Sequence, residues 1–445
     1  WNYTIGGTWR HFFNNSNLFF VMSRNHLNNT ALKYLDYDDE NSQKILDYKS
    51  EETENKTRLE YNFEKNNYSI NIGSNLEDAK YTNNTTQKFT IGDSIITGIN
   101  NANLYFIKYG FFTQISKTFL ANALTSSFGL RIDGNSFTDN ANSPNLSPRL
   151  SLAYNLNNKI SINSNIGRFY QLPSYTILGF DNNGNYLNKD ADYISCDHAV
   201  IGIEYSPSSY SKITLESFYK SYNNYPFSIL DSISLANLGG DFGVVGNEDI
   251  SSISKGNSYG IEFLAQQKMS SSIYGILSAT YYRSRFEDKN DQLISSSWDN
   301  RFILNMTAGK KFKNNIELGF KYRYSGGSPY TPIDIINSSN RAIWDINQRG
   351  VLDYNLLNTQ RLNGAHVLDV RIDKKWFFKS WSINAYIDIE NILNSKSQLP
   401  SQYGIDPNLG PLVEGTGENS DSYPLYEIIN NSGNLLPSIG LLIEF

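Results

Sequence analysis

The chain has 445 residues, a net charge of −6, and 14% aromatic against only 18% charged residues. No apolar stretch approaches the ~20 residues that a membrane-spanning helix needs, which excludes a helical membrane protein. The acidic balance without a basic cluster argues against nucleic acid as a partner. The single cysteine, Cys196, excludes an intramolecular disulfide.

Apolar residues recur at every second position along the chain, clearly so at 316–324, 368–373, 383–390 and 439–445. This period predicts β-strands with one apolar and one polar face. In chain order, short links are expected near 14–17, 65–67, 156–158, 206–210, 269–272, 313–315 and 379–380. Long polar links are expected near 36–50, 85–101, 179–192, 230–256, 331–360 and 395–436. Short links at one end and long links at the other are typical of a transmembrane β-barrel, with periplasmic turns and extracellular loops.

Aromatic residues collect where bilayer interfaces would lie. Those beside the short links share the parity of the apolar face and predict the periplasmic girdle: Phe13, Phe63, Tyr154, Tyr205, Phe312, Trp376, Trp381 and Phe445. The outer girdle is expected to contain Tyr170, Tyr222, Tyr281, Tyr322 and Tyr324. The charged residues predicted to face the lumen are Arg10, Arg58, Glu60, Arg131, Glu204, Glu216, Glu262, Arg301, Glu317, Arg323, Asp369, Arg371, Asp373, Asp388 and Glu390.

The expected fold class is therefore all-β, an antiparallel transmembrane β-barrel of about 17 strands. Single-chain bacterial barrels have an even number of strands, and the last strand here must descend to the periplasm. An odd count means that the first strand, 1–13, descends as well. The chain is therefore expected to be the C-terminal part of a larger barrel, because an open sheet edge does not suit lipid.

Several segments resemble TonB-dependent outer-membrane receptors. Residues 147–154 (SPRLSLAY) and 166–174 (IGRFYQLPS) are similar to their mid-barrel hairpin. Further similar segments are 297–301 (SWDNR), 326–332 (GGSPYTP), 367–375 (VLDVRIDKK), 388–394 (DIENILN) and the closing strand that ends in Phe445. The resemblance implies a 22-stranded barrel around an N-terminal plug. Residues 1–445 would then be the C-terminal part of the barrel, with the plug and about five strands outside this chain.

In such receptors, extracellular loops and the plug apices catch a ligand, and a TonB protein driven by the inner-membrane proton gradient pulls on the plug. The resemblance thus implies an active transporter in outer-membrane lipid, with the TonB complex as partner through the plug. Ferric siderophore or haem is the favoured nutrient, with oligosaccharide or peptide as the rival, and a surface lipoprotein is a further candidate partner. The alternative is a passive porin-like or structural outer-membrane barrel that acts as a partner in a larger assembly. Neither reading requires a cofactor or catalytic residues.

Aromatic loop residues are the candidate ligand contacts, because aromatic faces suit siderophores, haem and sugars alike. They are Tyr175, Phe180, Tyr186, Phe242, Tyr330, Trp344, Tyr403 and Tyr426. The competing interpretation is that these rings pack against one another within the loops.

The other sequence motifs do not predict a metal site or a catalytic site. Two acidic groups, one with Asp36, Asp38, Asp39 and Glu40 and one with Asp181, Asn183, Asn185 and Asp192, suggest calcium, but Tyr186 stands where a calcium loop needs glycine. The string Gly256-Asn-Ser-Tyr-Gly260 matches a hydrolase nucleophile elbow, yet Ser258 is expected to lead into a strand rather than a strand-to-helix turn. His11, His26, His198 and His366 are scattered without zinc-site spacing. The expectation is no metal and no enzyme.

Overall fold

The computed structural model describes residues 1–35, 43–91, 94–139, 144–182, 184–238, 248–270, 272–406 and 422–445. Within these ranges, one 19-stranded sheet contains 17 long strands and two short ones, β13 (Ile233–Ser234) and β16 (Leu293–Ser295). The long strands are β1 (Tyr3–Phe12), β2 (Ser16–Tyr34), β3 (Lys44–Lys65), β4 (Tyr68–Ile91), β5 (Ser94–Phe119), β6 (Leu124–Asn135), β7 (Asn145–Asn155), β8 (Ile160–Gln171), β11 (Ile194–Ser208), β12 (Ser211–Ser228), β14 (Ile250–Ser270), β15 (Ile273–Glu287), β17 (Phe302–Lys311), β18 (Ile316–Ser325), β23 (Ala365–Phe377), β24 (Ser382–Glu390) and β29 (Leu436–Glu444). The expected strand number is confirmed.

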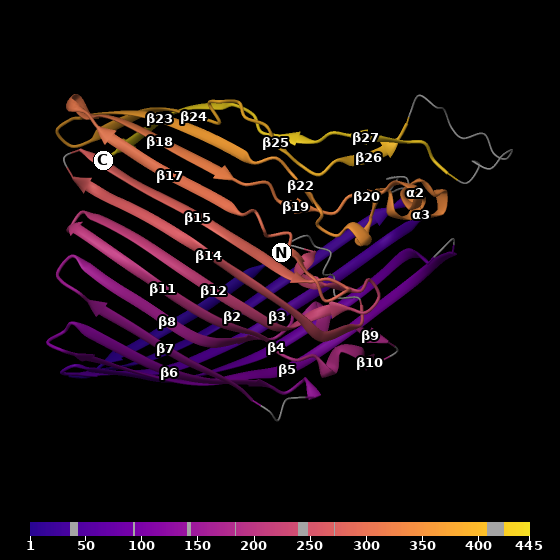
Figure 1. Ribbon diagram of the computed structural model, residues 1–445, viewed down its shortest axis with the longest axis horizontal. Helices are drawn as coiled ribbons and strands as arrows, with labels where there is room; N and C mark the ends of the chain where they lie inside the picture. The colour runs from indigo at the N-terminus through magenta and orange to yellow at the C-terminus, as the bar shows by residue number, and fades with distance from the viewer. Residues whose placement is uncertain are drawn as a thin grey trace.

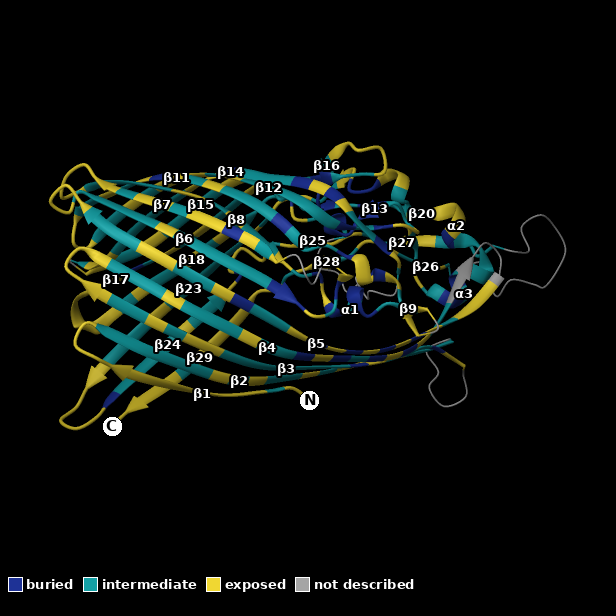
Figure 2. Cartoon of the chain, turned by 90° about the horizontal axis from the view of Figure 1, so that it is seen from below, coloured by how far each residue is buried: buried dark blue, intermediate teal, exposed yellow. Residues whose placement is uncertain are grey.

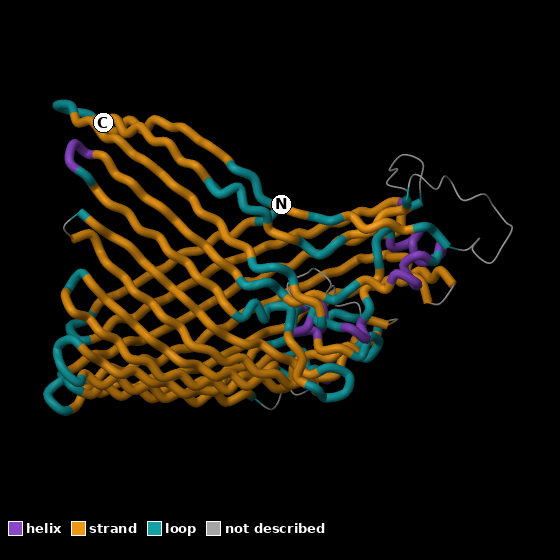
Figure 3. The backbone as a smooth tube through the Cα atoms, turned by 45° about the horizontal axis from the view of Figure 1, so that its top comes forward, coloured by secondary structure: helices purple, strands orange, loops and turns teal. Residues whose placement is uncertain are grey.

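Each long strand pairs antiparallel with the next one along the chain, so the sheet is a simple meander. The sheet curls into a tilted barrel wall, with the short turns at one end and the long loops at the other (Figure 1, Figure 3). Among the described residues, no ladder joins β29 back to β1, so these two are the edge strands. The predicted all-β barrel architecture is confirmed.

The two faces of the wall differ as the alternation predicts. Ile372 on β23 lies between Leu318 on β18 and Ile387 on β24, and these outward side chains are 48%, 38% and 49% exposed. Alternate positions face the lumen, where Arg371 donates to Asp373 on the same strand at 2.8 Å. The outward apolar side chains suit lipid, and the lumenal charged side chains pair with one another inside the barrel.

The aromatic belts are present, with one exception. Tyr154 and Phe312 at the turn end are 41% and 45% exposed, and Tyr281 at the loop end is 54% exposed. Tyr222, however, was wrongly expected in the outer girdle. It shares the parity of lumenal Glu216 and lies against Phe286, with ring centroids 5.4 Å apart.

Strands β3, β4 and β5 are unusually tall, with 22, 24 and 26 residues against 10 in β17. The long link expected at 85–101 is therefore wrong, because β4 runs to Ile91 and β5 starts at Ser94. The polar residues of this stretch bond to one another on the buried inner face. Asn83 donates to the Tyr81 hydroxyl at 2.9 Å, and Thr85 donates to Asn83 at 2.5 Å.

The loops carry only short elements. These are α1 (Tyr175–Leu178), β9 (Asp181–Asn182), β10 (Asn185–Tyr186), η3 (Leu187–Asp190), η4 (Leu235–Asn237), η5 (Lys313–Asn315), β19 (Pro329–Tyr330), β20 (Ile333–Asp334), α2 (Ile335–Ser339), α3 (Arg341–Asn347), β21 (Val351–Leu352), η6 (Tyr354–Leu356), β22 (Gln360–Arg361), β25 (Ser397–Gln398), β26 (Gln402–Ile405), β27 (Leu425–Ile428) and β28 (Asn431–Ser432). Of the helices in the described ranges, none has the length and hydropathy to cross a membrane.

Candidate functional site

The apolar core of the molecule lies at the loop end of the barrel. We call it the loop core. It consists of Ala79, Tyr81, Ala102, Leu104 and Phe106 from β4 and β5, together with Tyr175, Ile177, Leu178, Ala191, Leu235 and Ile250 from the loops and the start of β14. Buried residues accordingly gather at the loop end in Figure 2, near α1, β9 and β13. The tall strands thus provide a wall above the membrane on which the extracellular loops fold inward.

Tyr175 anchors the loop core to the barrel. Its ring is 7% exposed and meets Phe106 edge to face at 5.5 Å. Its hydroxyl lies 2.6 Å from a Glu54 carboxylate oxygen and 3.1 Å from Glu77, and it also accepts from the Lys108 ammonium. Burial, followed by the hydrogen bond to Glu54 and the charge of Glu77, raises the pKa of Tyr175 above its ordinary value. The phenol therefore stays a proton donor at physiological pH.

Asn188 joins the two loop segments of the core. Its fully buried amide nitrogen donates to the carbonyls of Ile177 at 2.8 Å and Glu248 at 2.9 Å. Its amide oxygen accepts from the Ile250 N–H at 2.9 Å. Because all three partners are backbone groups, Asn188 replaces the hydrogen bonds that a regular strand would have supplied.

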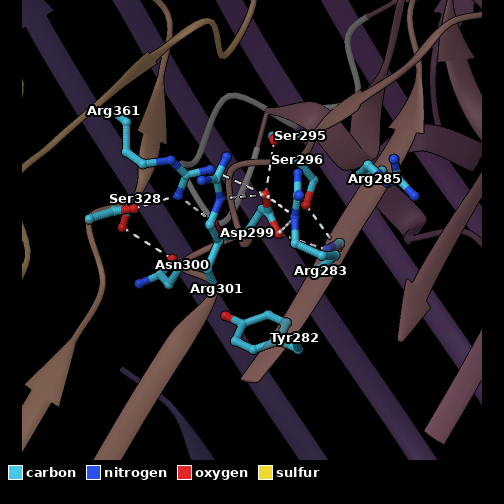
Figure 4. Close-up of polar contacts among 12 residues, drawn as sticks. Tyr282, Arg283, Arg285, Ser295, Ser296, Asp299, Asn300, Arg301, Ser328 and Arg361 are labelled. Atoms are coloured by element: carbon cyan, nitrogen blue, oxygen red, sulfur yellow. Dashed lines mark hydrogen bonds and ion pairs between the residues drawn. The ribbon is translucent and has the colours of Figure 1, made fainter. Parts of the chain in front are cut away.

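A second polar centre surrounds the fully buried carboxylate of Asp299 (Figure 4). Arg283 on β15 and Arg361 on β22 each place a guanidinium nitrogen 3.2 Å from Asp299 Oδ2. Arg301 approaches to 4.0 Å. Ser295 also donates to Asp299 Oδ2, at 2.9 Å. We call Asp299 with these three arginines the guanidinium cluster.

The guanidinium cluster completes the edge of β15. On one side this strand pairs with β17 up to Tyr281 and with β16 from Arg285, so residues 282–284 have a ladder only on the other side, with β14. Asp299 Oδ1 accepts from the Ser284 N–H at 2.9 Å, and the Arg301 carbonyl accepts from the Tyr282 N–H at 2.8 Å. The loop segment therefore satisfies the backbone groups that the ladder omits.

Arg361 links the cluster to the loop after β18. Its guanidinium donates to the carbonyls of Asp299 at 2.5 Å and Gly327 at 2.6 Å. A Cβ on Gly327 would lie 1.6 Å from the Leu362 carbonyl oxygen, so only glycine fits this close approach. Burial and the neighbouring Arg301 charge lower the pKa of Arg361 below its ordinary value.

The structure brings together the predicted ligand contacts of the loop after β8. Tyr175 belongs to the loop core and Tyr186 packs against it, with the Tyr186 hydroxyl donating to the Asn103 carbonyl at 2.9 Å. Phe180, half-buried, follows α1, and its N–H donates to the Ile177 carbonyl at 3.2 Å. These rings therefore share the part of the mouth above β4 and β5.

The other described candidates lie on the later loops. Burial, followed by the charges of Glu427 and Tyr330, raises the pKa of Tyr403 above its ordinary value. Trp344 is 7% exposed in α3, whereas Tyr426 on β27 is 43% exposed. Phe242 lies outside the described residues. As ligand contacts, all eight residues remain predictions.

Sequence reasoning did not single out Glu54, Glu77 and Lys108, which hold Tyr175 from three different strands. Their side chains are 13%, 15% and 23% exposed, and Lys108 pairs with both carboxylates. They lie on β3, β4 and β5, far apart in the sequence, and only the fold brings them together at Tyr175. Asp299 lies in a segment that the sequence flagged, although nothing in that segment indicates a buried charge.

The structure supports no catalytic or metal-binding role for the remaining sequence motifs in the described residues. Ser258 lies inside β14, opposite Lys220 and Ser284. Across the described ranges, no group of three or more His, Cys, Asp and Glu side chains is placed to hold a metal. The acidic stretch 36–40 and Asn183 lie outside those ranges, so neither calcium hypothesis is placed by the structure.

A hollow of about 780 Å³ lies on the outer wall between β6 and β12 rather than in the mouth of the barrel. Its lining includes the outward side chains of Phe128, Leu146 and Ile166, which are 52%, 48% and 58% exposed. Because this face is turned to lipid, we do not regard the hollow as a nutrient site.

These features define an outer-membrane type of β-barrel whose extracellular loops fold into its mouth. The chain belongs to the family described as "TonB dependent receptor-like, beta-barrel", whose family model matches residues 1–392. Members of this family are outer-membrane transport receptors rather than enzymes, so the predicted family and location are confirmed. No curated protein matches the chain.

Several solved structures share the fold. The ferric enterobactin receptor PfeA of Pseudomonas aeruginosa, solved as a mutant, is 16% identical in sequence and has a TM-score of 0.68. The match covers 99% of this chain and 61% of the PfeA chain. The ferripyoverdine receptor of the same organism is 12% identical with a TM-score of 0.64, covering 89% and 52%. The ferric yersiniabactin uptake receptor FyuA of Yersinia pestis is 9% identical with a TM-score of 0.64, covering 99% and 61%. The chain thus spans about half to two thirds of the length of these proteins.

Proposed function

We propose that the chain is the barrel portion of an active transporter that binds a scarce nutrient at its extracellular loops and imports it with energy from a TonB complex. The observation that carries the proposal is the loop core, because inward-folded loops anchored by Tyr175 suit a barrel that captures a ligand. A general diffusion pore needs no apolar core in its mouth. Catalysis has no part in this proposal.

Ferric siderophore or haem is the favoured nutrient. The solved structures named above are receptors for ferric enterobactin, ferripyoverdine and ferric yersiniabactin, which supports this choice for a chain of the same fold. The aromatic residues at Tyr175 and on the later loops suit flat or aromatic ligands, and they would suit oligosaccharide or peptide as well.

We further propose that a plug and additional strands complete the receptor. The edge strands β1 and β29 each present one unpaired row of backbone groups, which costs several kcal/mol per group in hydrocarbon. Apolar Ile5 and Trp9 on β1, 69% and 54% exposed, support the placement of this edge in a lipid-facing wall. Further strands would form hydrogen bonds with the unpaired backbone groups of β1 and β29, and the plug would make the contact with TonB.

The test is uptake of radioactive iron, supplied as ferric enterobactin, ferripyoverdine or haem, by cells that express the receptor. Active transport predicts uptake that stops when TonB is deleted or when a protonophore collapses the proton gradient. Uptake that persists in both conditions would support the passive alternative. Purified receptor in liposomes provides the control, because a porin would pass small sugars without any energy source.

A further inference from the structure

The guanidinium cluster has more positive charge than its structural role requires. Arg283, Arg301 and Arg361 surround one carboxylate, which leaves a surplus of two positive charges if each group is ionised. Within the part of the chain that the structure describes, none of the three has a second carboxylate in ion-pair range. This surplus stands out in a chain whose net charge is −6.

The three arginines do not share Asp299 equally. Arg283 and Arg361 have side chains only 25% and 26% exposed and hold the carboxylate at 3.2 Å. Arg301 is 49% exposed and approaches no closer than 4.0 Å. Asp299 is thus engaged mainly by Arg283 and Arg361, and Arg301 is the most exposed arginine of the cluster (Figure 4).

The backbone at Arg301 is also unusual. Its φ is +68°, in the left-handed region that bulky side chains rarely adopt. The Arg301 carbonyl is needed to accept from Tyr282, but that role does not require a guanidinium. An arginine at a position where asparagine or glycine would be less strained indicates a use for the side chain itself.

We propose that Arg301, supported by Arg283 and Arg361, forms a binding site for a phosphate or carboxylate group. A guanidinium presents paired N–H donors that match both anions, and the surplus charge supplies the attraction. The anion reaches the site either as part of a soluble ligand or as a lipid headgroup phosphate of the outer leaflet. This proposal concerns binding alone and stands whether or not the chain takes part in energised import.

The test compares Arg301→Asn with Arg323→Gln in the full receptor purified in detergent. Asparagine tolerates the left-handed backbone, so Arg301→Asn removes the charge without added strain. Arg323 is the matched control, since its side chain is 46% exposed and forms a one-to-one ion pair with Asp369 at 3.1 Å. Inorganic phosphate and citrate, titrated by calorimetry, are the soluble probes. Vesicles with and without lipid A are the lipid probe.

Loss of a charge-assisted hydrogen-bonding partner predicts about ten- to hundredfold weaker binding in Arg301→Asn and unchanged binding in Arg323→Gln. If only the lipid A vesicles show this difference, the anion is a lipid phosphate, and if only the soluble probes show it, the anion belongs to a soluble ligand. Equal binding by wild type and Arg301→Asn for every probe would overturn the proposal, as would an equal loss in both variants. Should Arg301→Asn fail to fold, Arg301→Lys keeps the charge but not the paired donors, and undiminished binding by it would refute the proposed geometry.

Discussion

The substitution Tyr175→Phe isolates the anchor of the loop core. It removes the hydroxyl that joins α1 to Glu54, Glu77 and Lys108 but keeps the ring that meets Phe106. A phenol has one proton, so one strong bond to a carboxylate is lost, and hydrogen bonds to charged groups contribute ~1.5–3 kcal/mol. The loop should therefore open about ten to a hundred times more often, while the barrel wall keeps its stability.

Hydrogen exchange measures this opening directly. The amide of Leu178 donates to the Ser174 carbonyl and that of Gly179 to the Tyr175 carbonyl, so both should exchange about ten to a hundred times faster in the variant. Tyr210→Phe, in a turn where the ring is 51% exposed, is the control and should change neither amide. Unaltered exchange in Tyr175→Phe would show that ring packing alone holds the loop and that the anchor has no energetic role.

Three further outcomes follow from the wall, the cluster and the loops. Ile372→Lys on the lipid face should destabilise the barrel by ~2–4 kcal/mol in urea unfolding from vesicles, whereas lumen-facing Ser278→Lys should cost little; equal effects would contradict the assigned faces. Asp299→Asn should lower the free energy of unfolding by ~3–5 kcal/mol, because three guanidinium groups lose their counter-charge; an unchanged melting temperature would argue against it. Burial and the charges of Asp231 and Glu248 raise the pKa of Tyr354 to about 12. The protonated phenol thus favours the folded loop below pH ~10, and this contribution is lost as the pH rises toward 12. The difference in phenolate absorbance between wild type and Tyr354→Phe isolates this residue, and a difference that appears near pH ~10 would refute the shift.

The barrel could be predicted because two solvents act on alternate residues. Lipid outside the wall and water inside it require apolar and polar residues to alternate along a strand. This alternation is visible in the sequence at Ile316, Leu318 and Phe320. The tall hairpin of β4 and β5 was missed for the opposite reason. Above the membrane both faces of a strand meet water or protein, so Thr85 and Asn100 were assigned to a loop although both are buried in the structure.

The candidate site was predictable in its residue types but not in its connections. The aromatic loop residues were identified, yet the packing of Tyr175 and Tyr186 at the loop core depends on contacts between distant segments. Tyr175 meets Glu54 across 121 positions of the chain, and no local pattern encodes such a pairing. The burial of Asp299 likewise follows from Arg361, which is 62 positions away.

The position of the loop core gives the protein two parts that respond differently to temperature. Burial of Leu178, Leu104 and Phe106 removes apolar surface from water, and this driving force weakens on cooling. The outer wall exchanges contacts with lipid, which is itself apolar, so it lacks that source of heat-capacity change. Cooling is therefore expected to loosen the extracellular loops while the strands beneath them remain paired.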